Sequence, residues 1–205
     1  MVIVAQLVVA TRWETPYDLT RNTISDLGVV GCGTIEAASG PVQACSPWHA
    51  GMNVTFVVIG SLLAIGAVLS TRAVRQAVGV RLAGAGMGLL VVAGISSAAV
   101  GLVPLDVDGE LHALVATPVF VTQPVALLLL GAAFVARRRR LIGAVILASG
   151  LVAATGSVAF AVTLVTGDVG GLYERIALWP CQVGVAALGW DVLRAHRHPV
   201  WETAA

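Results

Sequence analysis

Long, uninterrupted apolar stretches dominate the pattern of this chain. A helix needs about 20 apolar residues, each rising about 1.5 Å, to cross about 30 Å of hydrocarbon. We expect membrane-spanning helices at about residues 1–13, 50–70, 82–103, 111–136, 141–166 and 176–194. The pattern therefore predicts an all-α fold, a polytopic bundle of about six transmembrane helices that forms a single domain over residues 1–205.

The first of these stretches is unusual because its apolar run, Met1–Ala10, is only about half as long as a span. No basic segment precedes it and no small-residue cleavage site follows it, so it is not typical of a signal peptide. We expect a first helix that is either very short or truncated, with the true start of the protein upstream.

The composition agrees with a membrane protein. Apolar residues make up 58% of the chain, charged residues 11%, and the mean hydropathy is +0.91, whereas a soluble domain has about 45–50% apolar and about 25% charged residues. Membrane lipids are thus the expected surroundings. The net charge of +1 argues against nucleic acid as a partner. Lysine is absent while Ala, Val and Gly abound, which indicates a GC-rich bacterial source and hence a bacterial cytoplasmic membrane.

Charge is sorted along the chain and predicts the topology. Nine of the twelve arginines lie in three segments, Arg72–Arg81, Arg137–Arg140 and Arg194–Arg197, and nine of the eleven acidic residues lie in the stretches before and between these. Arginine flanking a span stays on the cytoplasmic side. Both termini are therefore expected in the cytoplasm, with a long outer loop at residues 14–49.

Two of the three cysteines, Cys32 and Cys45, lie in this outer loop. Disulfides persist outside the cytoplasm, and closing a loop of this size stabilises a fold by about 3 kcal/mol in the chain-entropy model. A Cys32–Cys45 disulfide is our prediction. Two free thiols and a pair of metal ligands are the alternatives, and Cys181, within the last span, is expected to be a packing residue.

Polar residues inside or beside spans are costly and are therefore functional candidates. Here they gather at the outer helix ends. The candidates for catalysis are Asp26, His49, His112 and Glu174. The candidates for substrate binding are Ser25, Asn53, Arg175 and Gln123. On a helix, His49 shares a face with Asn53 and His112 shares a face with Gln123.

These residue types suit more than one role. A histidine beside a carboxylate can serve as general acid or base near neutral pH. Two histidines and one acid could also ligate a catalytic zinc, but no motif such as H-E-x-x-H or G-x-S-x-G supports a specific reaction. We assign no metal site and leave the cofactor unknown. The structural alternative is helix capping and solvation of helix ends, for example at Asp26.

Three segments carry a resemblance to a known family: Asn22-Thr-Ile-Ser-Asp-Leu-Gly28, Cys45-Ser-Pro-Trp-His-Ala-Gly-Met-Asn53 and Gly171-Leu-Tyr-Glu-Arg175. With these, the chain resembles the bacterial and archaeal integral membrane proteins grouped as domain of unknown function 998. The resemblance covers nearly the whole chain and implies a six-helix membrane protein with a polar outer loop after the first helix. It implies no activity.

Three classes of function remain open. The first is an outer-face protein that acts on or binds a lipid-like substrate, for which prolines at 118 and 124 could bend a helix and make room. The second is a non-catalytic subunit or stabilising partner, which forms homo- or hetero-oligomers through glycine-rich helix faces such as Gly84–Gly88. A small transporter ranks lowest, because the four clear spans lack an ionisable residue at mid-depth.

Overall fold

The computed structural model describes residues 2–14, 16–37, 40–166 and 169–197. The described chain forms six α-helices: α1 (Val2–Ala10), α2 (His49–Val78), α3 (Val80–Leu102), α4 (Gly109–Ala136), α5 (Arg140–Thr166) and α6 (Gly170–Arg197). Between α1 and α2 lie a short 3-10 helix, η1 (Ser25–Gly28), and an antiparallel hairpin of β1 (Gly33–Ala37) and β2 (Gly40–Ala44). The helices α2 to α6 are each long and apolar enough to cross a membrane. The predicted all-α transmembrane bundle with a short first helix is confirmed.

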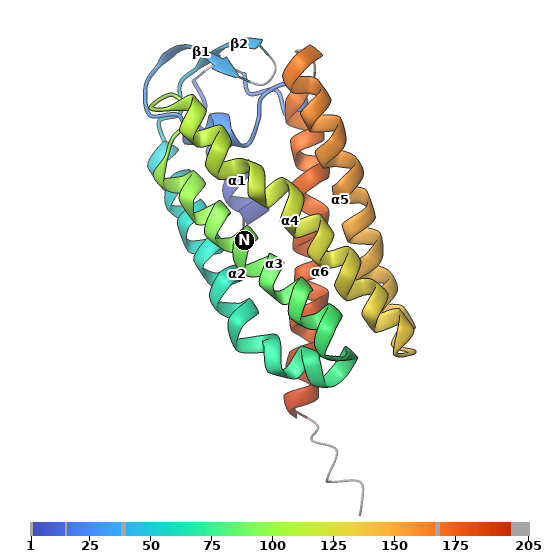
Figure 1. Ribbon diagram of the computed structural model, residues 1–205. Helices are drawn as coiled ribbons and strands as arrows, with labels where there is room; N and C mark the ends of the chain where they lie inside the picture. Colours follow the sequence, from blue (N-terminus) through green and yellow to red (C-terminus); the bar gives the residue numbers. More distant parts are fainter. Residues whose placement is uncertain (1, 15, 38–39, 167–168, 198–205) are drawn as a thin grey trace, which may run out of the picture.

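The long helices run up and down, and each packs against the next in sequence (Figure 1). The short helix α1 packs against α2 and η1. The segment between α1 and α2, which we call the cap (residues 11–48) and which includes the hairpin, covers one end of the bundle (Figure 1). We call this end the cap end and the opposite end the arginine end.

Glycines bring neighbouring helices into backbone contact. Between α2 and α3, a Cβ atom on Gly94 would lie 2.6 Å from the Gly60 carbonyl oxygen. Between α4 and α5, a Cβ atom on Gly131 would lie 2.5 Å from the backbone nitrogen of Leu147, and one on Gly143 would lie 2.7 Å from that of Val135. In lipid, such close approach supplies packing energy where no hydrophobic effect acts between helices. The tight α4–α5 contacts lie toward the arginine end.

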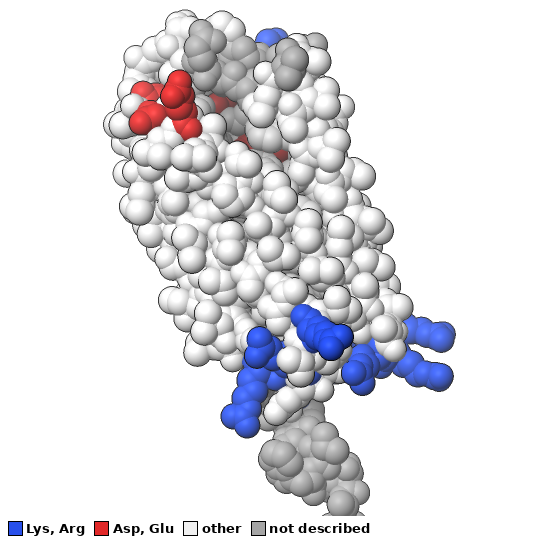
Figure 2. Space-filling view, viewed as in Figure 1, with Lys and Arg blue, Asp and Glu red and all other residues white. Residues whose placement is uncertain are grey.

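Charged side chains separate between the two ends (Figure 2). Most basic side chains gather at the arginine end, where α2 meets α3, where α4 meets α5, and where α6 finishes, whereas Arg12, Arg21 and Arg175 belong to the cap end. Acidic side chains gather at the cap end, over the α3–α4 connection. Asp191 is an exception, because it pairs with Arg139 at the arginine end at 2.8 Å. Asp168 lies outside the described residues.

Two helix boundaries differ from the expected spans. The helix α2 continues eight residues past residue 70 to Val78, because a helix can extend beyond the bilayer after its apolar run has ended. The helix α6 begins at Gly170, six residues before the expected start at 176. Glu174 and Arg175, expected at the outer end of the last span, therefore lie within the first two turns of α6, because the helix includes polar turns that come before its apolar run.

The hairpin of the cap was not expected from the sequence. Cys32 precedes β1 and Cys45 follows β2, and a disulfide joins their side chains with a Cα–Cα distance of 4.3 Å. The neighbouring residues Gly33 and Ala44 are the outermost pair of the hairpin register. The disulfide thus closes the open end of the hairpin.

Candidate functional site

The turn that begins η1 is held by a reciprocal pair of side chains, Thr23 and Asp26. The Asp26 backbone N–H donates to Thr23 Oγ1 at 3.2 Å, and the Thr23 backbone N–H donates to Asp26 Oδ2 at 2.8 Å. The Thr23 hydroxyl also donates to Asp26 Oδ1 at 2.6 Å. This arrangement is a capping box, in which two side chains satisfy the first backbone donors of a helix. It fixes the backbone on both sides of Ser25.

Asp26 is completely buried and lines neither of the two cavities described below. Burial raises its pKa above the usual range, while the hydrogen bonds from Thr23 and Asn22 act in the opposite direction. Burial also raises the pKa of Tyr17, which lies beside this turn and donates to the Thr23 carbonyl at 2.5 Å. In the structure Asp26 therefore holds the turn that carries Ser25 and does not itself face the cavity.

Arg175 anchors the cap to α6. Its Nη1 donates to the carbonyl oxygens of Leu19, Asn22 and Gly171 at 2.8–2.9 Å, and its Nη2 donates to the Tyr17 hydroxyl at 2.7 Å. A planar guanidinium can serve several acceptors at once from one buried position. Gly171 permits this docking, because a Cβ atom there would collide with the Asn22 carbonyl oxygen.

Glu174, one turn into α6, meets η1 directly. Its Oε2 accepts a hydrogen bond from the Ile24 backbone N–H, and its Oε1 lies 3.4 Å from the Ser25 hydroxyl. Arg175 forms no salt bridge with it, since the one salt bridge within the described residues joins Arg139 and Asp191. Glu174 thus presents a buried carboxyl group to the turn and to the space beside it.

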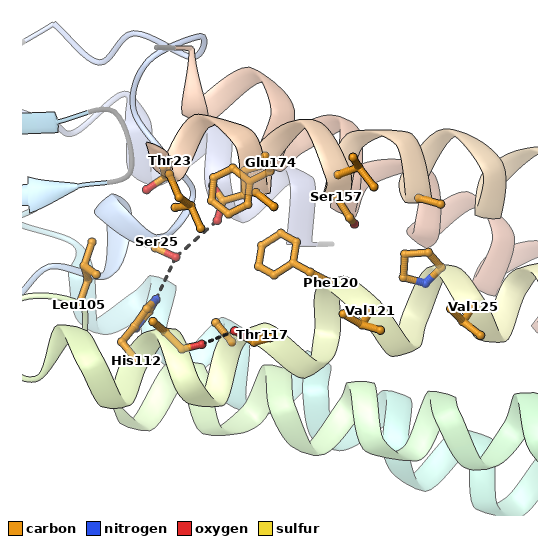
Figure 3. Close-up of a pocket in the computed structure, with 18 residues that line it drawn as sticks. Thr23, Ser25, Leu105, His112, Thr117, Phe120, Val121, Val125, Ser157 and Glu174 are labelled. Carbon is orange, nitrogen blue, oxygen red and sulfur yellow. Dashed lines mark hydrogen bonds between the residues drawn. The ribbon is translucent and has the colours of Figure 1, made fainter. Parts of the chain in front are cut away.

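Ser25 also contacts His112, which comes from the first turns of α4. His112 Nδ1 donates to the Val103 carbonyl at 2.6 Å, since a carbonyl oxygen can only accept. That bond fixes the ring and leaves Nε2 as the acceptor that faces the Ser25 hydroxyl at 3.1 Å. Figure 3 shows the resulting line from His112 through Ser25 to Glu174, with side chains from α4, η1 and α6.

The middle of α4 departs from a regular helix. The Ser96 hydroxyl, from α3, donates to the Val115 carbonyl at 2.5 Å and accepts from the Val119 backbone N–H at 3.1 Å. It therefore stands between a donor and an acceptor that pair directly in an uninterrupted helix, one residue from Pro118, which has no N–H. Side-chain insertion and proline are recognised causes of helix bending.

A cavity of about 690 Å³ lies beside this part of α4, between α4 and α5. Its cap end is polar, with Thr23, Ser25, His112 and Glu174, and the rest of its lining is mainly apolar. Figure 2 shows acidic atoms recessed in a hollow at this end of the molecule. The rim is lipid-facing, because Val121, Val158 and Leu164 line the cavity and are each more than half exposed.

The cavity has a packing explanation. The glycine contacts that join α4 and α5 lie toward the arginine end. Nearer the cap end, Phe120 and Phe160 stack with ring centroids 5.0 Å apart, and both line the cavity. The glycines let α4 and α5 approach closely toward the arginine end, whereas the two phenyl rings hold these helices apart nearer the cap end. Space therefore remains between α4 and α5 beside the rings. Ser157 also lines this space, and its buried hydroxyl has no hydrogen-bond partner among the described residues (Figure 3).

A second, smaller cavity of about 60 Å³ reaches Ser25 and Glu174 from the other side. It contains the side chain of Gln123, which is buried in α4, and also those of Gln6 and Gln182. Gln6 accepts a hydrogen bond from Trp179 Nε1 at 2.8 Å. His112 and Gln123 thus share one helix but line different cavities, which meet at Ser25 and Glu174.

Four of the predicted site residues line neither cavity: Asp26 and Arg175, described above, and His49 and Asn53. His49 is half-buried at the start of α2, and its Nδ1 is 2.8 Å from the Ser46 carbonyl oxygen. Asn53 donates to the Gly28 carbonyl at 2.9 Å and so ties the end of η1 to α2. Within the described residues, no three His, Cys, Asp or Glu side chains come together in a way that could hold a metal ion.

Sequence reasoning did not single out Thr23, Gln6 or Ser157. Each carries a usable signal, however. Thr23 and Asp26 have the T-x-x-D spacing of a capping box. Gln6 interrupts an apolar helix, and Ser157 is a polar residue inside a span, which is the criterion that identified the other candidates. The separation of Glu174 and Ser25 by 149 residues explains why their contact was not predictable.

Five long apolar helices, with a polar site buried where their ends meet the cap, define a multi-pass α-helical membrane protein. The family model described as "Protein of unknown function (DUF998)" matches residues 1–191. The chain therefore belongs to this family, as its sequence motifs implied. Neither the curated proteins nor the solved structures gave a match to this chain.

Proposed function

We propose that this protein binds an amphiphilic, membrane-dissolved ligand in the larger cavity, with the polar group of the ligand at Ser25, His112 and Glu174. The lining of the cavity carries the proposal, because it is polar at the cap end and apolar along α4 and α5. Its volume of about 690 Å³ falls in the range of ligand-binding cavities. Its exposed apolar rim suits a ligand that enters sideways from the bilayer.

The polar lining favours a neutral head group. No Arg or Lys side chain belongs to the described lining, whereas the carboxyl group of Glu174 does. An anionic head group would therefore face a carboxyl group without a counter-ion, at a depth where charge is costly. A hydroxyl group finds an acceptor in Glu174, and an ester carbonyl finds a donor in Ser157.

The proposal includes the sidedness of the protein. We propose that the cap end faces away from the cytoplasm of a bacterial cell, with the protein in the cytoplasmic membrane. Support comes from the basic side chains at the opposite end, which favour the cytoplasmic side. Further support comes from the Cys32–Cys45 disulfide in the cap, since disulfides persist in oxidising compartments.

A binding titration tests the proposal. The full chain in phosphatidylcholine nanodiscs would be titrated with a pyrene-labelled monoacylglycerol, which has a neutral head group and one acyl tail. We expect saturable binding at one site. The substitution Ala154→Phe should weaken binding at least tenfold, because Ala154 lines the cavity and a phenyl ring there fills part of it.

The matched control is Ala148→Phe, which places the same side chain on an exposed position of α5 outside both cavities. It should bind the probe as the unchanged protein does. Binding no stronger than to empty nanodiscs, or equal affinities for the Ala154→Phe variant and the unchanged protein, would refute the proposed function.

A further inference from the structure

We propose that Ser25 is a nucleophile and His112 its general base, so that the site transfers an acyl group from a membrane-dissolved ester. This inference rests on the proposed function, because the same cavity must hold the acyl chain. It goes further in assigning a covalent step to one side chain. The observation that carries it is the contact of the Ser25 hydroxyl with His112 Nε2 at 3.1 Å, at the polar end of an apolar cavity.

The geometry is that of an activated serine. Nucleophilic serines lie within hydrogen-bond reach of a base whose other side is held by a third group. Here the Val103 carbonyl holds His112 Nδ1 at 2.6 Å, so the free lone pair of the ring points toward Ser25. A backbone carbonyl thus occupies the position that a carboxylate takes in a Ser-His-Asp triad. The capping box of Thr23 and Asp26 fixes the backbone on both sides of the serine.

The position of Ser25 in the site is equally suited to this role. Its backbone lies in a turn that is held at both ends, by the hydrogen bond from the Thr23 N–H to Asp26 at the start and by Asn53 at the Gly28 carbonyl. Its side chain reaches both cavities. The larger cavity can hold an acyl chain. The smaller one, with about 60 Å³ and three glutamine side chains, has room and polar partners for water.

The proposed reaction has two steps, acylation of Ser25 and hydrolysis of the acyl ester. Ser25 Oγ attacks the ester carbonyl carbon while its proton passes to His112 Nε2. The carbon–oxygen bond to the alcohol breaks, and His112 returns the proton to that oxygen, so that the alcohol leaves and an acyl ester remains on Ser25. Water then attacks the acyl carbon, giving one proton to His112, which restores it to Ser25 Oγ as the free acid departs.

A covalent probe tests the inference without a known substrate. The full chain in nanodiscs would be treated with a long-chain alkyl fluorophosphonate, in which an activated serine displaces fluoride. We expect one adduct per chain by intact mass, mapped to Ser25 by tandem mass spectrometry. Because a general base contributes about 10²- to 10⁴-fold, the substitution His112→Gln should slow labelling about a hundredfold. Ser25→Ala should abolish it.

The control variant is Ser70→Ala, which removes a half-buried hydroxyl on α2 outside both cavities and should label like the unchanged protein. Mapping the adduct in the unchanged protein needs no variant, so misfolding of Ser25→Ala cannot obscure the result. If the pyrene-labelled probe binds but Ser25 stays unlabelled, the nucleophile is refuted and the binding function stands. Equal labelling rates with His112→Gln would refute the base. Absence of both binding and labelling would refute both proposals.

Discussion

Arg175 offers the sharpest test of how the cap is held over the site. It makes four hydrogen bonds, to three backbone carbonyls and to the Tyr17 hydroxyl, and two of the carbonyl bonds are buried. Hydrogen bonds to a charged group contribute about 1.5–3 kcal/mol each. The four are not independent, and the Asn22 carbonyl keeps the Tyr17 hydroxyl as a donor at 3.2 Å. We therefore expect Arg175→Ala to lower the free energy of unfolding by about 4 kcal/mol, a large part of the about 5–15 kcal/mol typical of a domain.

The substitution Arg175→Lys separates geometry from charge. Lysine keeps the positive charge but cannot reach all of these acceptors with one ammonium group, so we expect about half the loss. Arg21→Ala is the control, because Arg21 is an exposed arginine of the same cap segment, and it should leave stability unchanged.

Chemical unfolding in detergent micelles gives the free energies, and amide hydrogen exchange shows where the structure opens. In the Arg175→Ala variant, exchange should rise in residues 17–28 and remain slow in α3 and α4. Part of the docking should survive, since Gly171 and Leu172 donate from their backbone to the Arg21 and Thr20 carbonyls. If the lysine variant were as stable as the unchanged protein, or if exchange rose only within α6, Arg175 would not be the anchor.

Three further predictions concern the cap and the helix packing. Reducing the Cys32–Cys45 disulfide should lower the free energy of unfolding by about 3 kcal/mol, measured by chemical unfolding with and without reductant. Burial raises the pKa of Asp26, so the folded state holds this proton more tightly than the unfolded state, and stability declines as pH rises from about 4 through the folded pKa. Asp26→Asn, which mimics the protonated acid, should flatten this decline in unfolding measurements across pH; an unchanged slope would assign it to another group. Gly94→Ala should destabilise by about 1–3 kcal/mol through overpacking against α2, whereas Gly88→Ala, with no atom within 4 Å of the added carbon, should have no adverse effect on the thermal midpoint; similar losses for both would contradict the close approach.

The fold was predictable because lipid makes strong demands on a sequence. A helix that spans the bilayer must be apolar along its whole length, and flanking arginines must stay on the cytoplasmic side of the membrane. The number of helices and the sorting of charge were therefore both visible in the sequence. The helix ends were less accessible. Polar residues such as Glu174 and Arg175 belong to α6, whereas hydropathy alone begins this span at about residue 176. The β-hairpin around the disulfide carried no such signal, since its strands are five residues each.

The candidate site was predicted in composition but not in arrangement. Ser25, His112 and Glu174 were all named as candidates, and they meet in the structure. His49 was named for the same reasons and lies apart, against the Ser46 carbonyl. The difference depends on contacts 87 and 149 residues apart in the chain. Periodicity reports which residues share a helix face, but it does not report which helices meet at a cap.

The residues of the family motifs differ in the partners of their hydrogen bonds, and this difference is further evidence for function. Thr23 bonds with Asp26 in the turn, Asn53 donates to a backbone carbonyl of the cap, and Arg175 joins the cap to α6, so these three hold the structure of the cap. Ser25 differs, because the contacts of its hydroxyl are with two side chains, His112 and Glu174, and it faces two cavities. The capping box of Thr23 and Asp26 already fixes the backbone around Ser25, so the turn does not need the Ser25 hydroxyl. The arrangement instead holds one hydroxyl, with an imidazole nitrogen beside it, at the polar end of a lipid-facing cavity, which is the geometry that the proposed acyl transfer requires.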